Sequence, residues 1–528
     1  ELMIRGGTAP YTVSVLGNEY MINSAGERTI PVTIDDITGQ YTIGITVTDI
    51  SGQVATMEHT INTIWEAAVI ISDELGSSYT DATLIVTPRQ LVVTTDVVLD
   101  HCTIYCASED YDNITQTQWV VPYYSKLTIK NCIIQSGCPD KMWEGIKVYG
   151  VRFSNPAQIH SLVNVNGSLI QDAVKAVESF SNGTIIANGS NFENNQYGIY
   201  YNKFITKPYP TNFQQVISLR SRRLTANAIE NCNFRTTRNL NDETRYPKAG
   251  IYMDNVWGIT MKGCKFINEM PWQTVSDPSQ RGIGIHSVAS SFEADSYNAS
   301  TSTFSGLHYG VYATGDCSNR AIAVLNSDFD NSMFGIYVNE NSGAKILNNN
   351  IDVMSSSILS SVTNFRTSTQ GMYLNTSKSY NVEGNVISSG TTGMYINNSG
   401  VDASKIKNNT FSNAVNAVKV IGQNSDYGID GGEGYLGVQF LCNDFVSNTN
   451  DIGVINGNMR KQQGERNAPT GNQFSIRNPS RYQFRVDCSA AWQIPRGYTY
   501  YQHNDLISES NGFVRELQRE RYVGVRPD

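Results

Sequence analysis

The sequence predicts an all-β chain in which most residues form a parallel β-helix, a rod of short strands that coil around a common axis. A repeat of about 22 residues and a fixed Asn or Gly within each repeat predict this fold. Composition agrees, because only 16% of the 528 residues are charged, while 43 are Gly. A repeat of this size cannot bury its apolar side alone, so successive repeats must stack on one another.

A tripeptide of Gly, a large aliphatic residue and Tyr marks the repeat. Its copies begin at Gly198, Gly250, Gly310, Gly335, Gly371 and Gly393, and looser copies begin at Gly145, Ala176, Gly282, Ala417 and Asp451. A Phe or Ile often precedes the tripeptide by 6 residues, as Phe192 precedes Gly198. The next Phe or Ile often follows 16 residues later, as Phe266 follows Gly250, and the two spacings together give the period of 22.

A second position fixes the register of the repeats. In nine of eleven repeats, Asn or Gly stands three residues before the Phe or Ile. The nine are Asn131, Gly167, Gly189, Asn231, Gly263, Asn326, Asn348, Gly384 and Asn408; Thr301 and Cys442 are the exceptions. Asn and Gly tolerate a left-handed backbone, so we expect a tight corner there in each coil, and Asn ladders that pair from coil to coil. Eleven or more such coils would stack at about 4.8 Å. A helical repeat is the competing interpretation, which the Tyr, Ile, Val and Thr content disfavours.

The first 64 residues follow a different pattern. Apolar and polar residues alternate with a period of two in residues 11–15, 29–34 and 41–49, with turn residues between the runs. This pattern predicts a small β-sandwich over residues 1–64. We expect a linker and the start of the rod at 65–84, the rod over 85–505, and a C-terminal extension or a linker to a downstream domain at 506–528.

Two stretches of the predicted rod resemble a known group of proteins. Residues 126–150 resemble the first coils of secreted right-handed β-helix proteins of Bacteroidota, and residues 440–452, 463–464 and 471–474 resemble their closing coils. Residues 6–11 and 41–52 resemble the opening and closing strands of polycystic-kidney-disease-like and related Ig-like surface repeats of Bacteroidota. The resemblance implies a right-handed coil, an extracellular or cell-surface location and export by type IX secretion. Residues 505–528 do not resemble the sorting domain of that system, so we expect it to be absent or to lie downstream.

Composition excludes several classes of protein. No apolar run approaches about 18 residues, so no membrane-spanning helix is expected. A net charge of −9 argues against a nucleic-acid partner. The nine cysteines include no Cys-x-x-Cys pair. Cys132, Cys232 and Cys264 share one corner position, which favours a ladder of buried thiols; a Cys232–Cys264 disulfide and a local Cys102–Cys106 pair are the alternatives.

Acidic residues supply the candidates for catalysis and metal binding. Asp328 and Asp330 flank the inward Phe329, and Asp352 occupies the same register one coil later. Paired carboxylates of this kind can catalyse sugar hydrolysis or bind Ca²⁺. The simpler interpretation is that they are solvated side chains at an edge of the rod. Asp426, Asp430 and Glu433 lie in a Gly-rich loop and are weak Ca²⁺ candidates, with a long turn as the alternative. No other metal or cofactor is expected.

Insertions in the repeat supply the candidates for partner binding. The 6-residue turn after the Phe or Ile lengthens at four places, two of them on consecutive coils, so the extra residues should emerge from one edge. These loops carry Arg235, Arg238, Arg245, Tyr246, Trp272 and Arg281. Arg and aromatic residues suit protein contacts or sugar stacking. The alternative is that these are ordinary surface loops without a binding role. A further excursion adds a basic patch of Arg220, Arg222 and Arg223.

These observations predict a non-enzymatic structural or adhesive module of a large modular surface protein. The expected partners are neighbouring domains of the same chain, a surface glycan or protein ligand, and a second copy of the chain. Assembly into a surface filament or a hook-like adhesive appendage is a further hypothesis. The alternative is a polysaccharide lyase or glycoside hydrolase of the β-helix type, with Asp328, Asp330 and Asp352 as its site.

Overall fold

The computed structural model describes most of the chain. The described residues are 2–15, 18–28, 39–63, 68–72, 74–87, 90–107, 117–150, 161–203, 227–316, 321–354, 369–388, 390–427, 432–465, 468, 470–475, 482–487, 498–502 and 523–527. Within these ranges the chain forms strands and two short 3₁₀ turns, with no α-helix, which confirms the predicted all-β class. The chain divides into two compact units, residues 1–70 with 82–84, and residues 71–81 with 85–528.

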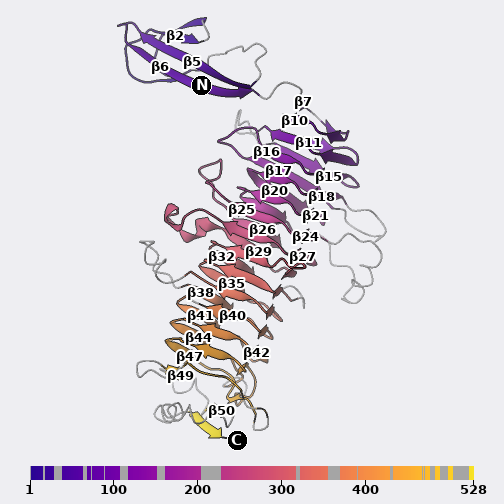
Figure 1. Cartoon of the computed structure of the whole chain (residues 1–528), viewed down its shortest axis with the longest axis vertical. Coiled ribbons are helices and arrows are strands. Elements are labelled where there is room, and N and C mark those ends of the chain that lie inside the picture. Colours follow the sequence, from indigo (N-terminus) through magenta and orange to yellow (C-terminus); the bar gives the residue numbers. More distant parts are fainter. Residues whose placement is uncertain are drawn as a thin grey trace. The chain divides into compact units, whose positions relative to one another are not determined.

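Three long parallel sheets make up the larger unit (Figure 1). The 14-strand sheet contains β7 (Val69–Ile71), β10 (Thr83–Val86), β13 (Thr103–Cys106), β16 (Ile133–Ser136), β19 (Leu169–Gln171), β22 (Asn191–Glu193), β25 (Asn233–Thr236), β28 (Lys265–Asn268), β31 (Ser302–Ser305), β34 (Ser327–Asp330), β37 (Asn350–Asp352), β40 (Val386–Ser388), β43 (Thr410–Ser412) and β46 (Asp444–Val446). The 15-strand sheet contains β8 (Glu74–Leu75), β11 (Gln90–Val93), β14 (Gln118–Val121), β17 (Trp143–Tyr149), β20 (Ala173–Phe180), β23 (Tyr197–Tyr201), β26 (Ala249–Asp254), β29 (Ile283–Val288), β32 (Tyr309–Thr314), β35 (Phe334–Asn339), β38 (Gln370–Asn375), β41 (Thr392–Asn397), β44 (Asn416–Gly422), β47 (Asn450–Gly457) and β49 (Tyr482–Asp487). The 13-strand sheet contains β9 (Tyr79–Thr80), β12 (Val97–Asp100), β15 (Lys126–Lys130), β18 (Leu162–Asn166), β21 (Thr184–Asn188), β24 (Ala228–Glu230), β27 (Ile259–Lys262), β30 (Phe292–Asp295), β33 (Ala323–Leu325), β36 (Lys345–Leu347), β39 (Asn381–Glu383), β42 (Ser404–Lys407) and β45 (Val438–Leu441).

The order of the strands defines the fold. Each coil gives one strand to each sheet in turn, and from β7 to β44 every strand pairs in parallel with the strand three positions later, as β34 pairs with β37. The last pair of the 15-strand sheet is β47 with β49. The predicted parallel β-helix is therefore confirmed. Its first coil begins at β7, and the described residues contain thirteen coils with all three strands. After the last of these coils, β48 (Gln462–Gln463), β50 (Tyr498–Gln502) and β51 (Val523–Pro527) form a small separate sheet.

The corners lie where the repeat predicts them. All nine Asn and Gly residues at the corner position have positive φ, between 46° at Asn326 and 68° at Gly384. Cys442, one of the two departures in residue type, has the same conformation, with a φ of 52°. Each corner joins a strand of the 13-strand sheet to a strand of the 14-strand sheet, as Asn131 joins β15 to β16. A left-handed residue turns the chain sharply, and Asn and Gly adopt it at little steric cost.

Two ladders fill the interior. Phe192, Phe234, Phe266, Phe304 and Phe329 stack along the axis, with ring centroids 4.5–4.9 Å apart and planes within 8° of parallel. A second ladder is polar and runs through Asn349, Asn385, Asn409, Asn443 and Asn472. In this second ladder each side-chain amide donates to the next side-chain carbonyl at 2.9–3.0 Å, so these buried amides pair from coil to coil, as predicted.

The cysteines of the described coils are free thiols. Cys132, Cys232 and Cys264 are buried directly after the corner residues, as the thiol ladder predicts, and no disulfide joins Cys232 to Cys264 or Cys102 to Cys106. Burial raises the pKa of Cys264 to about 12, so its thiol stays protonated. Cys317 and Cys488 lie outside the described residues.

The smaller unit is antiparallel. β2 (Tyr11–Val15), β3 (Asn18–Ile22), β5 (Gly39–Asp49) and β6 (Val54–Thr63) form a four-stranded sheet in the order β3-β2-β5-β6. β1 (Leu2–Ile4) pairs with β4 (Gly26–Arg28), and Ile4 packs into the same core as Val13 of β2. The alternation predicted in residues 11–15 therefore buries one side of this sheet. The Ig-like assignment of this unit stays a prediction.

Candidate functional site

A row of aromatic residues lies on the outer face of the 15-strand sheet. We call it the outer strip. It consists of Tyr200, Tyr252, His286, Tyr312, Tyr337, Tyr373 and Tyr395. These residues occupy one register position on seven consecutive coils, from β23 to β41, and each is half-buried. Contiguous aromatic surface of this length on a water-facing sheet is a candidate binding surface.

The rings of the outer strip stack along the axis of the helix. The centroids of Tyr312, Tyr337, Tyr373 and Tyr395 lie 4.8, 4.6 and 4.7 Å apart in succession, and the ring planes are within 22° of parallel. His286 interrupts the stack, because its ring stands edge-on to Tyr252 and Tyr312. The strip is therefore one ordered array rather than seven independent side chains.

The tripeptide of the repeat places the strip. Its central aliphatic residue points inward, as Ile336 does, so strand alternation turns the following Tyr337 outward. The Gly is required by the Phe ladder: a Cβ on Gly310 would lie 2.5 Å from Cδ1 of Phe329 and 2.7 Å from the carbonyl oxygen of Gly335. The spacing of this tripeptide predicted the repeat but not a surface formed by its outward Tyr, although strand alternation alone indicates that surface.

Two further rows flank the outer strip. On one side, Tyr309 stacks on Phe334 with centroids 4.6 Å apart, and His308 lies 4.2 Å from Tyr309. On the other side, Asn339, Asn375 and Asn397 form an amide row, in which Asn375 donates to Asn339 at 2.6 Å and Asn397 donates to Asn375 at 2.8 Å. The face thus combines ring edges, phenol hydroxyls and carboxamides on the same coil repeat.

Charge is absent from the middle of this face. From β29 to β41, five strands that are described throughout, every outward side chain is neutral once His286 is neutral. Burial lowers the pKa of His286 and of His308 to about 4, so both rings are neutral at pH 7. Burial raises the pKa of Tyr337 and of Tyr309 to about 12, so their hydroxyls stay protonated.

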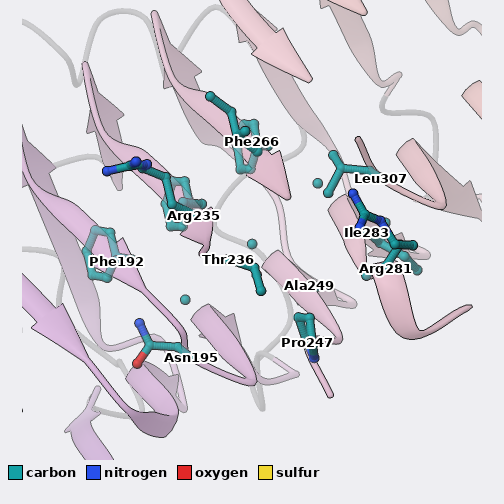
Figure 2. A pocket seen from close by; sticks show the side chains of 16 residues that line it. Phe192, Asn195, Arg235, Thr236, Pro247, Ala249, Phe266, Arg281, Ile283 and Leu307 are labelled. Carbon is teal, nitrogen blue, oxygen red and sulfur yellow. The ribbon is translucent and has the colours of Figure 1, made fainter. Parts of the chain in front are cut away.

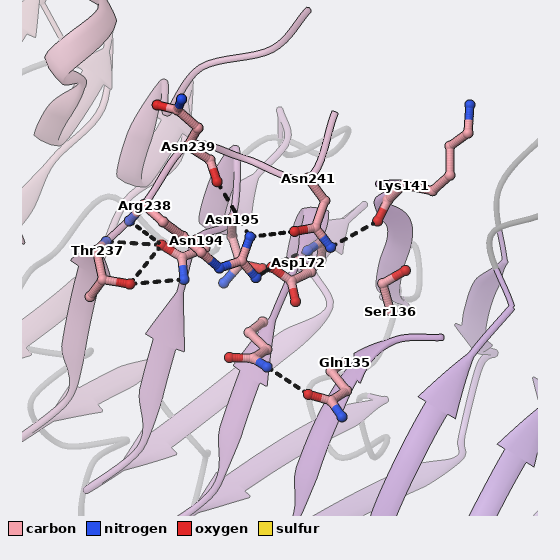
Figure 3. Close-up of polar contacts among 12 residues, drawn as sticks. Gln135, Ser136, Lys141, Asp172, Asn194, Asn195, Thr237, Arg238, Asn239 and Asn241 are labelled. Carbon is pink, nitrogen blue, oxygen red and sulfur yellow. Dashed lines mark hydrogen bonds and ion pairs between the residues drawn. The ribbon is translucent and has the colours of Figure 1, made fainter. Parts of the chain in front are cut away.

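The loops predicted to contact partners fold back onto the helix. All four insertions join the 14-strand sheet to the 15-strand sheet, so they emerge at one edge as expected. Figure 3 shows Arg238 between Asp172, at 2.7 Å, and the side-chain oxygen of Asn241. Asp172 is buried, and burial raises its pKa while Arg238 opposes the shift. Arg238 therefore neutralises a buried carboxylate.

Trp272 and Arg281 are buried in the next insertion, which contains the 3₁₀ turns η1 (Trp272–Thr274) and η2 (Pro278–Arg281). Trp272 packs against Met333 and Met354, which belong to later coils. The guanidinium of Arg281 donates to the carbonyls of Gly306, Met270 and Asn268 and lies 4.6 Å from the Trp272 ring. Burial lowers the pKa of Arg281 to about 10. Both side chains are out of reach of a partner in this conformation.

Arg235 lines a groove at the same edge. Its guanidinium bridges Glu193, at 3.0 Å, and Glu269, at 2.7 Å. The groove lies between Arg235 and Arg281 and is also lined by the rings of Phe192, Phe234 and Phe266 (Figure 2). Both arginines are already bonded within the chain, so the groove offers mainly apolar surface.

Arg245 and Tyr246 are half-buried. Arg245 donates to Asp242 and to the side-chain oxygen of Gln196, both at 2.9 Å. The Nζ of Lys248 lies 3.8 Å from the centre of the Tyr246 ring. Partner binding by these loops stays a prediction. Arg220, Arg222 and Arg223 lie outside the described residues.

The predicted carboxylate cluster lies on a different face, the outside of the 14-strand sheet. Asp330 and Asp352 are register partners on β34 and β37, and both are exposed. Asp328 is half-buried and accepts a hydrogen bond from the Thr301 hydroxyl at 2.7 Å. Ser305 donates to Asp330 at 3.4 Å. The register places Asp330 beside Asp352, while their catalytic role stays a prediction.

The Gly-rich loop keeps one of its three acids bonded to backbone. Asp426 accepts from the backbone N–H of Leu436 at 2.8 Å, and Glu433 is exposed. Asp430 lies outside the described residues. Among the residues that the structure describes, no group of three His, Cys, Asp or Glu side chains is arranged to hold a metal ion. Nor does this part of the chain contain a helix long and apolar enough to cross a membrane.

One comparison with known proteins, the family model, agrees with the fold. The family model described as "Right handed beta helix region" matches residues 249–433, which include β26 to β44. Among solved structures, the periplasmic alginate epimerase AlgG is similar at 12% identity, over 80% of this chain and 85% of that one, with a TM-score of 0.30. A point mutant of the same epimerase matches at 11% identity, over 80% and 77%, also with a TM-score of 0.30. A structural likeness at this level carries no argument about this chain. No curated protein sequence matches the chain.

Proposed function

We propose that this chain is a non-enzymatic, extracellular module of a surface protein, in which the β-helix holds a glycan on the outer strip. One observation carries the proposal: seven aromatic residues lie in register on seven coils and remain half-buried at a water-facing sheet. Residues with an apolar body and a polar tip are suited to ligands that are apolar on one side and hydroxylated on the other. Sugars have that character.

The rigidity of the surface also supports binding. Each Tyr of the strip is held by its neighbours and by a strand in a continuous sheet, so little side-chain freedom remains to be lost when a ligand binds. The groups repeat with every coil, which suits a polymer more than a single small molecule. A non-obligate partner protein would need an apolar centre with a polar rim, whereas this face alternates ring edges with amides and hydroxyls.

The wider setting of the proposal rests on the sequence resemblances. They support a modular surface protein of a Bacteroidota species, exported by type IX secretion, with residues 1–64 as an Ig-like or polycystic-kidney-disease-like repeat. Such a chain would have its own neighbouring domains, and a second copy of itself, as partners. A surface filament or hook-like adhesive appendage is the assembly that we propose for it.

A second candidate function is a polysaccharide lyase or glycoside hydrolase. The register pairing of Asp330 with Asp352 favours it, because hydrolases use two neighbouring carboxylates. Against it, both side chains are exposed, whereas a carboxyl group that acts as an acid near neutral pH is set in apolar surroundings. We therefore rank this function below glycan binding.

The experiment is a glycan binding screen run beside an activity screen on the same polysaccharides. We expect binding without cleavage, and loss of binding in the double variant Tyr337→Ala/Tyr373→Ala. The matched control is Val386→Ala, because Val386 is exposed on the outside of the 14-strand sheet. Polysaccharide cleavage that disappears in Asp330→Asn would overturn the proposal in favour of the enzyme. Equal binding by the double variant and the control would place the ligand elsewhere.

A further inference from the structure

We infer that the ligand of the outer strip is an uncharged polysaccharide that lies along the axis of the helix, over the coils from β32 to β41. This inference rests on the proposed function and adds the class and the direction of the glycan. It depends on three properties of the described face: which parts of the rings are free, which polar groups run beside them, and where charge is missing.

The rings present their edges rather than their faces. Along Tyr337, Tyr373 and Tyr395 the planes lie within 5° of parallel at 4.6–4.7 Å, so each face is covered by the next ring. At the two ends of the strip, Lys175 lies 4.5 Å from the centre of the Tyr200 ring and Lys419 lies 5.7 Å from that of Tyr395. A sugar ring therefore has no free face on which to stack within this run. What remains for a ligand is a row of ring edges and hydroxyl groups at the coil spacing.

The amide row runs beside the hydroxyl groups of the outer strip. In the amide row, the bonds from Asn397 to Asn375 and from Asn375 to Asn339 use one N–H and one oxygen lone pair of Asn375. A primary amide has two N–H groups and two lone pairs, so one of each is left for a ligand. Tyr373 and Asn375 stand two residues apart on β38 and point outward together. Each coil from β35 to β41 thus repeats one hydroxyl and one carboxamide, which suits a chain of hydroxylated rings lying parallel to the axis.

Charge selects the class of glycan. The chain carries a net charge of −9, yet the outward side chains from β29 to β41 are neutral. Of the lysines at the ends, Lys175 is already paired with Glu178 at 3.2 Å. An acidic polysaccharide would meet no cation on the described strands of this face and would be repelled by the protein as a whole. A neutral polysaccharide gains hydrogen bonds without leaving a buried charge unpaired.

The test measures binding of the full chain to a neutral and an acidic series, in low and in high salt. The probes are β-glucan, xylan and mannan on one side, and polygalacturonate and alginate on the other. We expect binding to at least one neutral polymer, with an affinity that salt leaves unchanged. The double variant Tyr337→Phe/Tyr373→Phe removes two hydroxyls and keeps the stack, and should weaken binding about tenfold or more, as should Asn375→Ala. Val386→Ala should bind like the parent chain.

Three results would overturn the inference. Binding restricted to acidic polymers, and lost in high salt, would refute an uncharged ligand while leaving glycan binding itself intact. No binding to any polymer would refute the proposed function together with this inference. Self-association in sedimentation measurements, abolished by the Tyr-to-Phe variant, would assign the strip to a second copy of the chain.

Discussion

The Phe ladder lies inside the β-helix on the 14-strand sheet, whereas the outer strip lies on the outside of the 15-strand sheet. Phe304 and Phe329 stack inside with centroids 4.5 Å apart and planes 7° from parallel. Tyr337 and Tyr373 stack outside at 4.6 Å and 5°. The stacking geometry is the same, but Phe304 and Phe329 are at most 1% exposed, while both tyrosines are half-buried.

The comparison separates stacking from burial. Stacking of two aromatic rings contributes only about 0.5–1.5 kcal/mol beyond the area it buries. Removal of a whole Phe side chain from water contributes about 1.5–3 kcal/mol, so the inner ladder should dominate stability. The outer strip keeps its polar edge in water, and this surface is available to a ligand. The Phe ladder and the outer strip thus share one stacking geometry, but the first stabilises the fold and the second is available to a ligand. Substitutions in the Phe ladder and in the outer strip can test this difference.

The largest effect is expected from Phe329→Ala. Phe329 packs between Phe304 and Ile351 of the adjacent coils and against Gly310, so its truncation leaves a closed cavity. The unfolding free energy should fall by about 3–5 kcal/mol, measured by denaturant titration monitored by circular dichroism. Glycan binding at a temperature where the variant is folded should be retained. A loss below about 1 kcal/mol would contradict the assignment of stability to the inner ladder.

The next effect concerns a buried acid at the end of the helix. Asp451 accepts hydrogen bonds from the Ser475 N–H and hydroxyl and from Asn448, and burial raises its pKa to about 6. Because the folded state holds this proton more tightly, its contribution to stability is present below pH 4 and is lost as the pH rises through 6. The advantage of Asp451→Asn over the parent should therefore grow between pH 4 and pH 6, by up to roughly 3 kcal/mol, and then level off.

Thermal unfolding of the parent and of Asp451→Asn across this pH range measures the difference. Asp444→Asn is the matched control, because Asp444 is an exposed acid on the adjacent strand β46. A difference that grows as the pH falls would have the wrong sign and would show that the hydrogen bonds outweigh burial.

A smaller loss of stability is expected from a substitution at Gly310, which lies against the Phe ladder and two residues before Tyr312 of the outer strip. Gly310→Ala would place a methyl group within 2.7 Å of the Phe329 ring and of the Gly335 carbonyl. One of these must shift, so the unfolding free energy should fall by about 1–3 kcal/mol. Gly44→Ala is the control, because a Cβ there has nothing within 4 Å. An unchanged melting temperature in Gly310→Ala would mean that the ring is free to move aside.

The smallest effect on stability is expected from Tyr337→Ala. It removes a half-buried ring from an open face, so no cavity forms, and we expect a loss of about 1 kcal/mol or less. The same substitution should have the largest effect on glycan binding. A loss of unfolding free energy as large as that of Phe329→Ala would contradict the different roles of the Phe ladder and the outer strip.

The corners, the period and both inner ladders follow from the sequence because each depends on a local property. Positive φ at Asn131 or Asn348 is a preference of the residue itself, and the inward position of Phe329 follows from strand alternation. The paired amides of Asn385 and Asn409 follow from the period. The same alternation turns Tyr337 outward, so the signal for the outer strip is also present in the sequence.

Only the tertiary structure decided what the insertions do and why the tripeptide begins with Gly. Arg238 meets Asp172 across 66 residues of chain, and Trp272 packs on Met354, contacts that no local pattern encodes. Gly310 is needed because Phe329 of the next coil fills the space that a Cβ would occupy. Each of these depends on residues that are distant along the chain and adjacent in space. By itself the sequence determined the coil, the corner and the direction in which each side chain points. Packing between coils then decided which arginines pair with carboxylates and which insertions pack onto the helix. It also decided that the outward tyrosines form one continuous uncharged surface.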